Sequence, residues 1–211
     1  MLVDQCLQEL HSILKRPQYK GLGCVTAESC TGGGIGEALT SISGISQWYW
    51  GGWITYSNQM KQDFLHVPKL TLKNHGAVSP ETVSAMALHA AQQADANISV
   101  AVSGIAGPDG GSIEKPVGTV YFAWTCSVFN IDLKLVMISF LKWIQDEMKL
   151  AIIAQPTLQK LSNASMKLTT SNNAQDYSVL ILGIQFSGDR QQVRSQTIAV
   201  ALRGWVEILN T

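Results

Sequence analysis

Charged residues are scarce in this chain, and neither sign is in excess. Only 14% of the 211 residues are charged, with 15 Lys and Arg against 15 Asp and Glu. A nucleic-acid partner requires a basic surface, and this composition supplies none. We therefore predict no nucleic-acid partner. Because so few charges remain to solvate the surface, we also predict that the chain buries part of it in an oligomer.

Paired cysteines are missing too. None of the four cysteines belongs to a CxxC pair: Cys6, Cys24, Cys30 and Cys126. This pattern predicts free thiols in a reducing compartment. Asp4 and Glu9 interrupt the N-terminus, so we predict no secretory signal and a cytoplasmic location.

Long apolar runs are also absent. The longest charge-free run, residues 38–60, is rich in Ser, Thr, Gln, Asn and Gly. A membrane-spanning helix needs about 20 predominantly apolar residues, so this polar content predicts no membrane span.

What the chain does have is apolar content, at 46%, and an alternation of helical and strand patterns. Ser79 followed by Pro80 is typical of a helix start, and Asp189 with Gln192 resembles a capping box. Helices are predicted at residues 3–15, 32–42, 58–67, 78–94 and from 189 onward. Strands are predicted at residues 22–28, 48–57, 98–104, 119–129 and 177–188. The pattern predicts an α/β fold, a three-layer sandwich with a mixed sheet and helices on both faces.

The stretch "TAESCTGGGIG" is the first of four that suggest chemistry. A strand that ends at Ser29 and turns through glycines into a helix directs backbone N–H groups at one point. Such a turn can hold a phosphate, a carboxylate or a developing oxyanion. It matches neither a Walker A loop nor a GxSxG motif. A structural role stays open, in which Ser29 or Thr31 caps the helix and the glycines permit close packing.

The second and third stretches also follow predicted strands. In "TYSNQMK", Lys61 can act as a general base if burial lowers its pKa, and Tyr56 can relay a proton. The alternative is a strand end with a solvated lysine. The Gly-rich loop at residues 103–111 would let a ligand approach the backbone closely, although a simple long turn is also possible.

The fourth stretch, "FSGDRQQVR", places Arg190 and Arg194 one turn apart at a helix start. The helix dipole disfavours cations there, so an anion between the two arginines would explain them. Solvated surface arginines are the alternative. The histidines share no metal-ligand spacing, and we predict no metal or cofactor.

Taken in order, these unusual stretches resemble the C-terminal domain of the competence/damage-inducible CinA family. The matching segments are "TAESCTGG", "GGWITYSNQMK", "HGAVSPETV", "VSGIAGPDGGSIEKPVGTVYFA" and "FSGDRQQVRSQT". The resemblance implies a hydrolase of the nicotinamide mononucleotide carboxamide. The products would be nicotinate mononucleotide and ammonia, in pyridine-nucleotide recycling. It further implies no cofactor, a small nucleotide substrate, and oligomers that are commonly dimers, so a homodimer or a larger homo-oligomer is expected.

The resemblance also assigns roles to residues. Ser29 would be the nucleophile, Lys61 its base, and Tyr56 would assist proton transfer, with backbone N–H groups after Ser29 as the oxyanion hole. The implied substrate-binding residues are Thr31, Gly32, Gly33, Ser103, Gly104, Gly107, Arg190 and Arg194.

One segment departs from the family pattern. Residues 127–178 separate two strands that a short path would otherwise join, so we predict a single domain, residues 1–211, interrupted there by an atypical insertion. The first half of the segment is apolar and suggests a helix, and the second half is rich in Ser, Thr and Asn and suggests a loop. The insertion leaves a second function open: a catalytically impaired member that binds a nucleotide or a partner.

Overall fold

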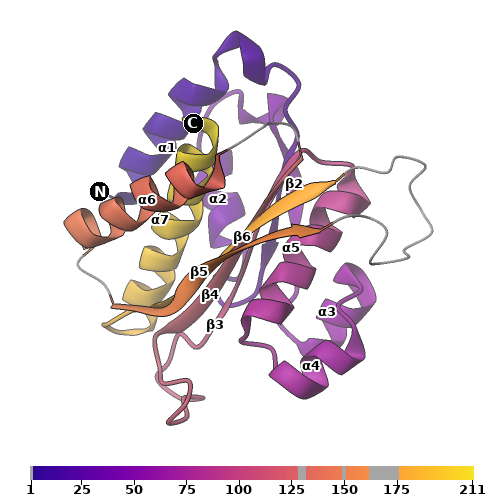
Figure 1. Cartoon of the computed structure of the whole chain (residues 1–211), viewed down its shortest axis with the longest axis vertical. Helices are drawn as coiled ribbons and strands as arrows, with labels where there is room; N and C mark the ends of the chain where they lie inside the picture. Colours follow the sequence, from indigo (N-terminus) through magenta and orange to yellow (C-terminus); the bar gives the residue numbers. More distant parts are fainter. Residues whose placement is uncertain (1, 128–131, 149–150, 162–175) are drawn as a thin grey trace.

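One six-stranded sheet organises the chain (Figure 1). The computed structural model describes residues 2–127, 132–148, 151–161 and 176–211. The strands are β1 (Cys24–Glu28), β2 (Tyr49–Ile54), β3 (Ile98–Gly104), β4 (Thr119–Cys126), β5 (Ala151–Leu161) and β6 (Tyr177–Gln185). Their order across the sheet is β2-β1-β3-β4-β6-β5.

The sheet is mixed, as predicted. β1 pairs in parallel with both β2 and β3, whereas the β3–β4, β4–β6 and β5–β6 pairs are antiparallel. The carboxyl ends of β1, β2 and β3 therefore meet at the same edge of the sheet. In open α/β sheets that edge is where ligands bind.

Helices cover both faces of the sheet, which confirms the predicted three-layer sandwich (Figure 1). One face carries α1 (Leu2–Leu14), α2 (Gly34–Thr40), α6 (Leu133–Trp143) and α7 (Arg190–Leu209). The other face carries α3 (Asn58–Leu65), α4 (Lys69–His75) and α5 (Pro80–Ala94). Three short turns complete the described elements: η1 (Pro17–Tyr19), η2 (Ile45–Gln47) and η3 (Ile144–Met148).

The core forms two layers because successive strand residues point to opposite faces. In β3, Val100 and Val102 join the cluster beneath α1 and α7, while Ala101 joins the cluster beneath α5. Trp124 of β4 stacks on Phe122, and its indole N–H donates to a carbonyl of α7 at 2.9 Å. Aromatic packing on one face thus fixes α7 against the sheet.

The predicted helix starts are confirmed at two places. The Ser79 hydroxyl accepts the amide N–H of Thr82, and Pro80 occupies the first turn of α5. Asp189 and Gln192 form the capping box that opens α7. Arg190 and Arg194 therefore lie on the first two turns of a well-defined helix.

Two elements were not predicted from the sequence. α4 begins directly after Pro68, at the point where the preceding helix was predicted to end. β5 contains Pro156 and pairs with β6 through two register shifts. Proline is tolerated there because β5 lies at the edge of the sheet and pairs on one side only, among the strands that the structure describes.

The apolar first half of residues 127–178 contains α6, in agreement with the predicted helix. Its side chains Val136, Phe140 and Trp143 are buried in the main core cluster. Phe140 contacts the Trp124 ring edge-on at 5.2 Å between centroids. The loop predicted for the second half falls largely on residues 162–175, outside the described residues.

Among the described residues, none of the helices has both the length and the apolarity to cross a bilayer. The same residues include no group of three His, Cys, Asp or Glu side chains that could hold a metal ion. The four cysteines are buried and carry thiols rather than disulfides.

Candidate active site

A cavity of about 150 Å³ opens where the parallel strands end. Ser29 follows β1, Tyr56 follows β2, and Ser103 and Gly104 end β3. The residues lining the cavity are Ser29, Cys30, Tyr56, Lys61, Ala77, Val78, Ser103, Gly104, Ala106 and Arg190. The cavity therefore brings together residues from all four stretches that the sequence analysis singled out.

Ser29 and Lys61 are in direct contact at the base of this cavity. The Nζ atom of Lys61 lies 2.9 Å from the Oγ atom of Ser29, and both side chains are buried. Nζ also donates to the carbonyl of Thr55 at 2.7 Å and to that of Tyr56 at 3.4 Å. α3 positions the lysine, since the Ser57 hydroxyl caps the helix four residues before it.

Burial prepares Lys61 to act as a base. Loss of solvation disfavours its charged form and lowers its pKa from 10.5 to about 8. A neutral amine has two N–H groups and one lone pair. The N–H groups can satisfy the carbonyls of Thr55 and Tyr56, which leaves the lone pair for the Ser29 hydroxyl proton.

The neighbouring thiol of Cys30 is in a different environment from Ser29. Cys30 lines the same cavity, but burial raises its pKa to about 12. The thiolate is the nucleophilic form of cysteine, so burial reduces the reactive fraction of this thiol. Ser29, by contrast, is in hydrogen-bond contact with the lysine amine.

Tyr56 and Arg190 form the outer rim of the cavity. Tyr56 is 63% exposed, and its hydroxyl accepts a hydrogen bond from Arg190 at 3.1 Å. Arg190 also donates to the carbonyl of Gly107 at 2.8 Å. The rim thus joins β2, the loop after β3, and the start of α7, and it presents a cation beside a phenol.

Ser103 and Gly104 form the wall at the end of β3. The buried Ser103 hydroxyl donates to the carbonyl of Ala77 at 2.7 Å, which holds the segment before α5 against the strand. A Cβ at Gly104 would lie 2.8 Å from the Thr119 carbonyl, so a side chain is sterically excluded there.

Glu28 is the functional candidate that the sequence analysis missed. It is the last residue of β1, it is 1% exposed, and its carboxylate accepts backbone N–H groups of α2 and the preceding turn. These donors are Gly33 at 3.0 Å, Ile35 at 3.0 Å and Gly36 at 2.9 Å. Those three amides already bind the carboxylate, so the predicted oxyanion hole after Ser29 cannot use them.

Five of the eight predicted substrate-binding residues do not line the cavity: Thr31, Gly32, Gly33, Gly107 and Arg194. Gly107 lies beside it, and its carbonyl accepts a hydrogen bond from Arg190. Thr31, Gly32 and Gly33 form the turn between Ser29 and α2, and Arg194 packs against that turn. The Thr31 hydroxyl donates to Glu28 at 2.6 Å, and Arg194 donates to the Thr31 carbonyl at 2.6 Å. Glycine is needed in the turn because Gly32 and Gly33 have φ angles of 59° and 97°.

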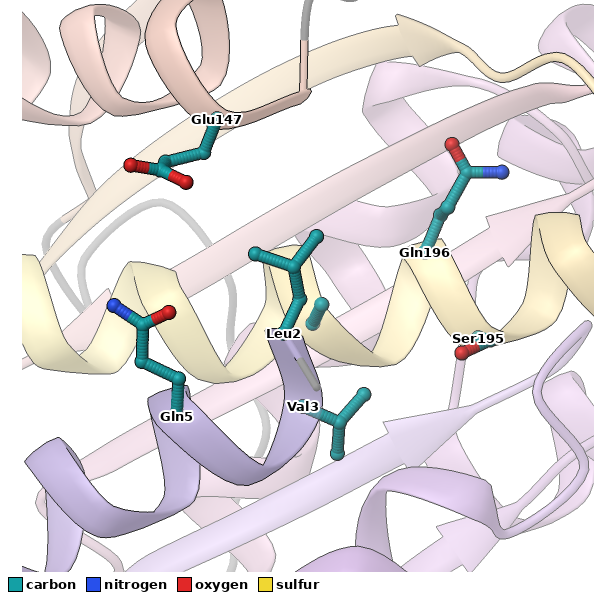
Figure 2. A pocket seen from close by; sticks show the side chains of 7 residues that line it. Leu2, Val3, Gln5, Glu147, Ser195 and Gln196 are labelled. Atoms are coloured by element: carbon teal, nitrogen blue, oxygen red, sulfur yellow. The ribbon is translucent and has the colours of Figure 1, made fainter.

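A larger hollow of about 600 Å³ lies elsewhere, between α1, α7 and η3 (Figure 2). Its lining residues are Leu2, Val3, Gln5, Glu147, Ser195, Gln196 and Ala199. This lining combines apolar and amide side chains with one carboxylate and contains no lysine to activate Ser195. Size alone therefore does not identify the reactive site.

The chain resembles a known family over most of its length. The family model described as "CinA C-terminal domain" matches residues 7–138. The chain is 53% identical over 105 residues to the nicotinamide-nucleotide amidohydrolase PncC of Enterobacter agglomerans, an alignment that covers 50% of this chain and 64% of that protein. It is 51% identical over 124 residues to PncC of Escherichia coli K12, covering 59% of this chain and 75% of that protein.

Solved structures show the same similarity. The competence/damage inducible protein CihA from Agrobacterium tumefaciens superposes with a TM-score of 0.72 at 31% identity, covering 100% of this chain and 97% of that one. A protein from Enterobacter asburiae, described as a competence or damage-inducible protein, gives a TM-score of 0.70 at 28% identity, with 98% of each chain covered.

Proposed function

Because the chain belongs to the CinA C-terminal domain family, we propose that it is an amidohydrolase acting on the carboxamide of a nicotinamide nucleotide. The single observation that carries the proposal is the buried 2.9 Å contact between Lys61 Nζ and Ser29 Oγ. Two relatives at 53% and 51% identity carry the name nicotinamide-nucleotide amidohydrolase, which makes nicotinamide mononucleotide the substrate to test.

The proposed reaction begins with attack by Ser29. Neutral Lys61 accepts the hydroxyl proton while Oγ adds to the carboxamide carbon. The tetrahedral adduct then collapses, Lys61 returns the proton to the amide nitrogen, and ammonia leaves an acyl ester on Ser29. A water molecule that gives its proton to Lys61 hydrolyses this ester, which releases the nicotinate product and restores the serine.

The shape of the site supports this substrate class. A cavity of about 150 Å³ has room for a single aromatic ring bearing an amide, so the ribose and phosphate would lie at the rim. Arg190 is exposed at that rim beside Tyr56 and can donate a charged, forked hydrogen bond to a phosphate. Tyr56 lines the same cavity and would pass a proton between the reacting groups and solvent.

Ammonia release from nicotinamide mononucleotide tests the proposal directly. The purified protein is expected to release ammonia and nicotinate mononucleotide in equal amounts. The matched control is Ser29→Ala, which should retain the fold by circular dichroism and lose several orders of magnitude in kcat. A wild-type protein that binds the nucleotide without releasing ammonia would instead support the impaired binding protein. Substantial activity in Ser29→Ala would point to direct attack by water.

A further inference from the structure

We infer that Glu28 and Arg194 are positioning residues that hold the turn after Ser29 between two charges of opposite sign. The inference rests on the proposed function, in which Ser29 is the nucleophile. It reassigns Arg194, which the sequence analysis placed at the substrate phosphate. It also gives a role to Glu28, which neither the sequence motifs nor the proposed reaction uses.

Glu28 and Arg194 together form what we call the clamp. Its negative half is the Glu28 carboxylate. It accepts four hydrogen bonds, three from amides around the start of α2 and one from the Thr31 hydroxyl. No Lys or Arg forms an ion pair with Glu28 among the described residues. The amides and the helix dipole stabilise this buried charge, so the carboxylate is tied to the main chain of the turn.

The positive half is the Arg194 guanidinium. It donates to the Thr31 carbonyl at 2.6 Å, and it lies 3.7 Å from the position a Cβ would take at Gly32. Its Nε atom is buried, so a substrate phosphate cannot reach that nitrogen. Thr31 therefore lies between the two charges, with its hydroxyl bound to Glu28 and its carbonyl bound to Arg194.

The clamp reaches the catalytic pair through the main chain. The carbonyl of Glu28 accepts the amide of Thr55 at 2.8 Å, and the carbonyl of Thr55 accepts Lys61 Nζ at 2.7 Å. On the other side, the amide of Ser29 donates to the carbonyl of Val102 at 3.1 Å. A displacement of the turn would therefore move Ser29 relative to Lys61, and misplacement by about 1 Å can cost about 100-fold in rate.

Two substrates separate a clamp from a phosphate ligand: nicotinamide mononucleotide, and nicotinamide riboside, which lacks the phosphate. For Glu28→Gln and for Arg194→Met, kcat should fall by about 100-fold with both substrates, while KM stays close to that of the wild type. Arg190→Ala serves as the contrast. It should raise KM for the nucleotide much more than for the riboside.

The matched control is Glu207→Gln, since Glu207 is also a buried carboxylate but pairs with Arg203 on α7, away from the cavity. This variant should lose thermal stability without losing kcat. Should Glu28→Gln fail to fold, Thr31→Val takes its place, because it keeps both charges and removes only the hydrogen bond to Glu28.

Labelling of Ser29 by a fluorophosphonate provides a readout that needs no substrate. The clamp variants should be labelled about 100-fold more slowly than the folded wild type. The inference fails if labelling and kcat stay at wild-type levels in both clamp variants, or if Arg194→Met raises KM for the nucleotide alone. If the wild-type protein releases no ammonia but its Ser29 reacts rapidly with the fluorophosphonate, the proposed substrate is wrong. The labelling rates of the clamp variants then test the inference on their own.

Discussion

Lys61 must be neutral to accept a proton from Ser29, and this requirement sets the pH dependence of activity. Its pKa is lowered to about 8, so only about a tenth of the lysine is neutral at pH 7. We expect kcat/KM to rise about tenfold per pH unit below pH 8 and to level off above it. Initial rates from pH 6 to pH 10 measure this profile. A rate that is flat between pH 6 and pH 8 would exclude Lys61 as the base.

The same residue should make the stability of the protein depend on pH. Its pKa is about 8 when folded and about 10.5 when unfolded, so between these values the unfolded chain binds more protons. The free energy of unfolding therefore rises with pH in this window, by about 2–3 kcal/mol between pH 7 and pH 10.

Lys61→Met has no ionisable group at this position. Subtracting the change in its free energy of unfolding from that of the wild type therefore cancels the contributions of all other titrating groups. Urea denaturation of the two proteins at pH 7 and at pH 10 gives the difference. The rise should be present in the wild type and missing in the variant; equal slopes would show that Lys61 titrates normally.

At the residue scale, the sequence predicted the side chains that meet in the cavity but not their supports. Ser29 and Tyr56 follow β1 and β2, Lys61 lies on α3, and the structure brings all three to one cavity. The role of Glu28 was not predictable, because a carboxylate that ends a strand looks like any solvated acid. Only the fold shows that α2 directs three amides at it.

At the scale of elements, α6 tests whether residues 127–178 contribute to the core. Phe140 is 2% exposed and packs edge-on against Trp124. Phe140→Ala should lower the free energy of unfolding by about 3–5 kcal/mol, because it leaves a cavity beneath the helix.

Ile138 provides the matched control on the same helix, since it is 61% exposed. Ile138→Ala should change stability by no more than about 0.5 kcal/mol. Denaturant titrations of both variants decide the matter. Equal small effects would show that α6 lies on the protein without supporting it.

The sequence predicted elements well where periodicity and caps agree, as at α5 and α7. It failed at α4 and β5 for different reasons. α4 is a seven-residue helix immediately after a proline, too short for a periodic pattern to emerge. β5 carries a proline inside the strand, and its place at the sheet edge, which makes the proline tolerable, depends on the other strands.

At the scale of the whole molecule, residues 127–178, the predicted insertion, should consist of a part that can be removed and a part that cannot. Leu161 at the end of β5 pairs with Tyr177 at the start of β6, so these two residues face each other across a hairpin. Replacing residues 162–176 with an Asn-Gly turn should preserve the fold and the activity, because that dipeptide favours the tight turn required.

Removal of residues 128–176 gives the contrasting variant, because it also deletes α6, η3 and the edge strand β5 and exposes the aromatic core beneath α6. We expect it to be insoluble or to melt far below the wild type. Melting temperature and ammonia release, measured on both variants, test whether residues 162–176 can be removed while the rest of the segment is required. A stable, active protein without α6 would show that the whole segment is dispensable.

The last helix completes the site, and this has a consequence for how the protein is made. Arg190 contacts a residue 134 positions earlier in the chain, and Arg194 contacts one 163 positions earlier. Contacts of such long range form late in folding, because the entropy of closing the loop must first be overcome. A ribosome-bound chain that has already formed β1 and α3 would thus contain Ser29 and Lys61 before Arg190 and Arg194 of α7 are in place. In refolding experiments, hydrolytic activity should return after the helical signal and only when α7 has docked.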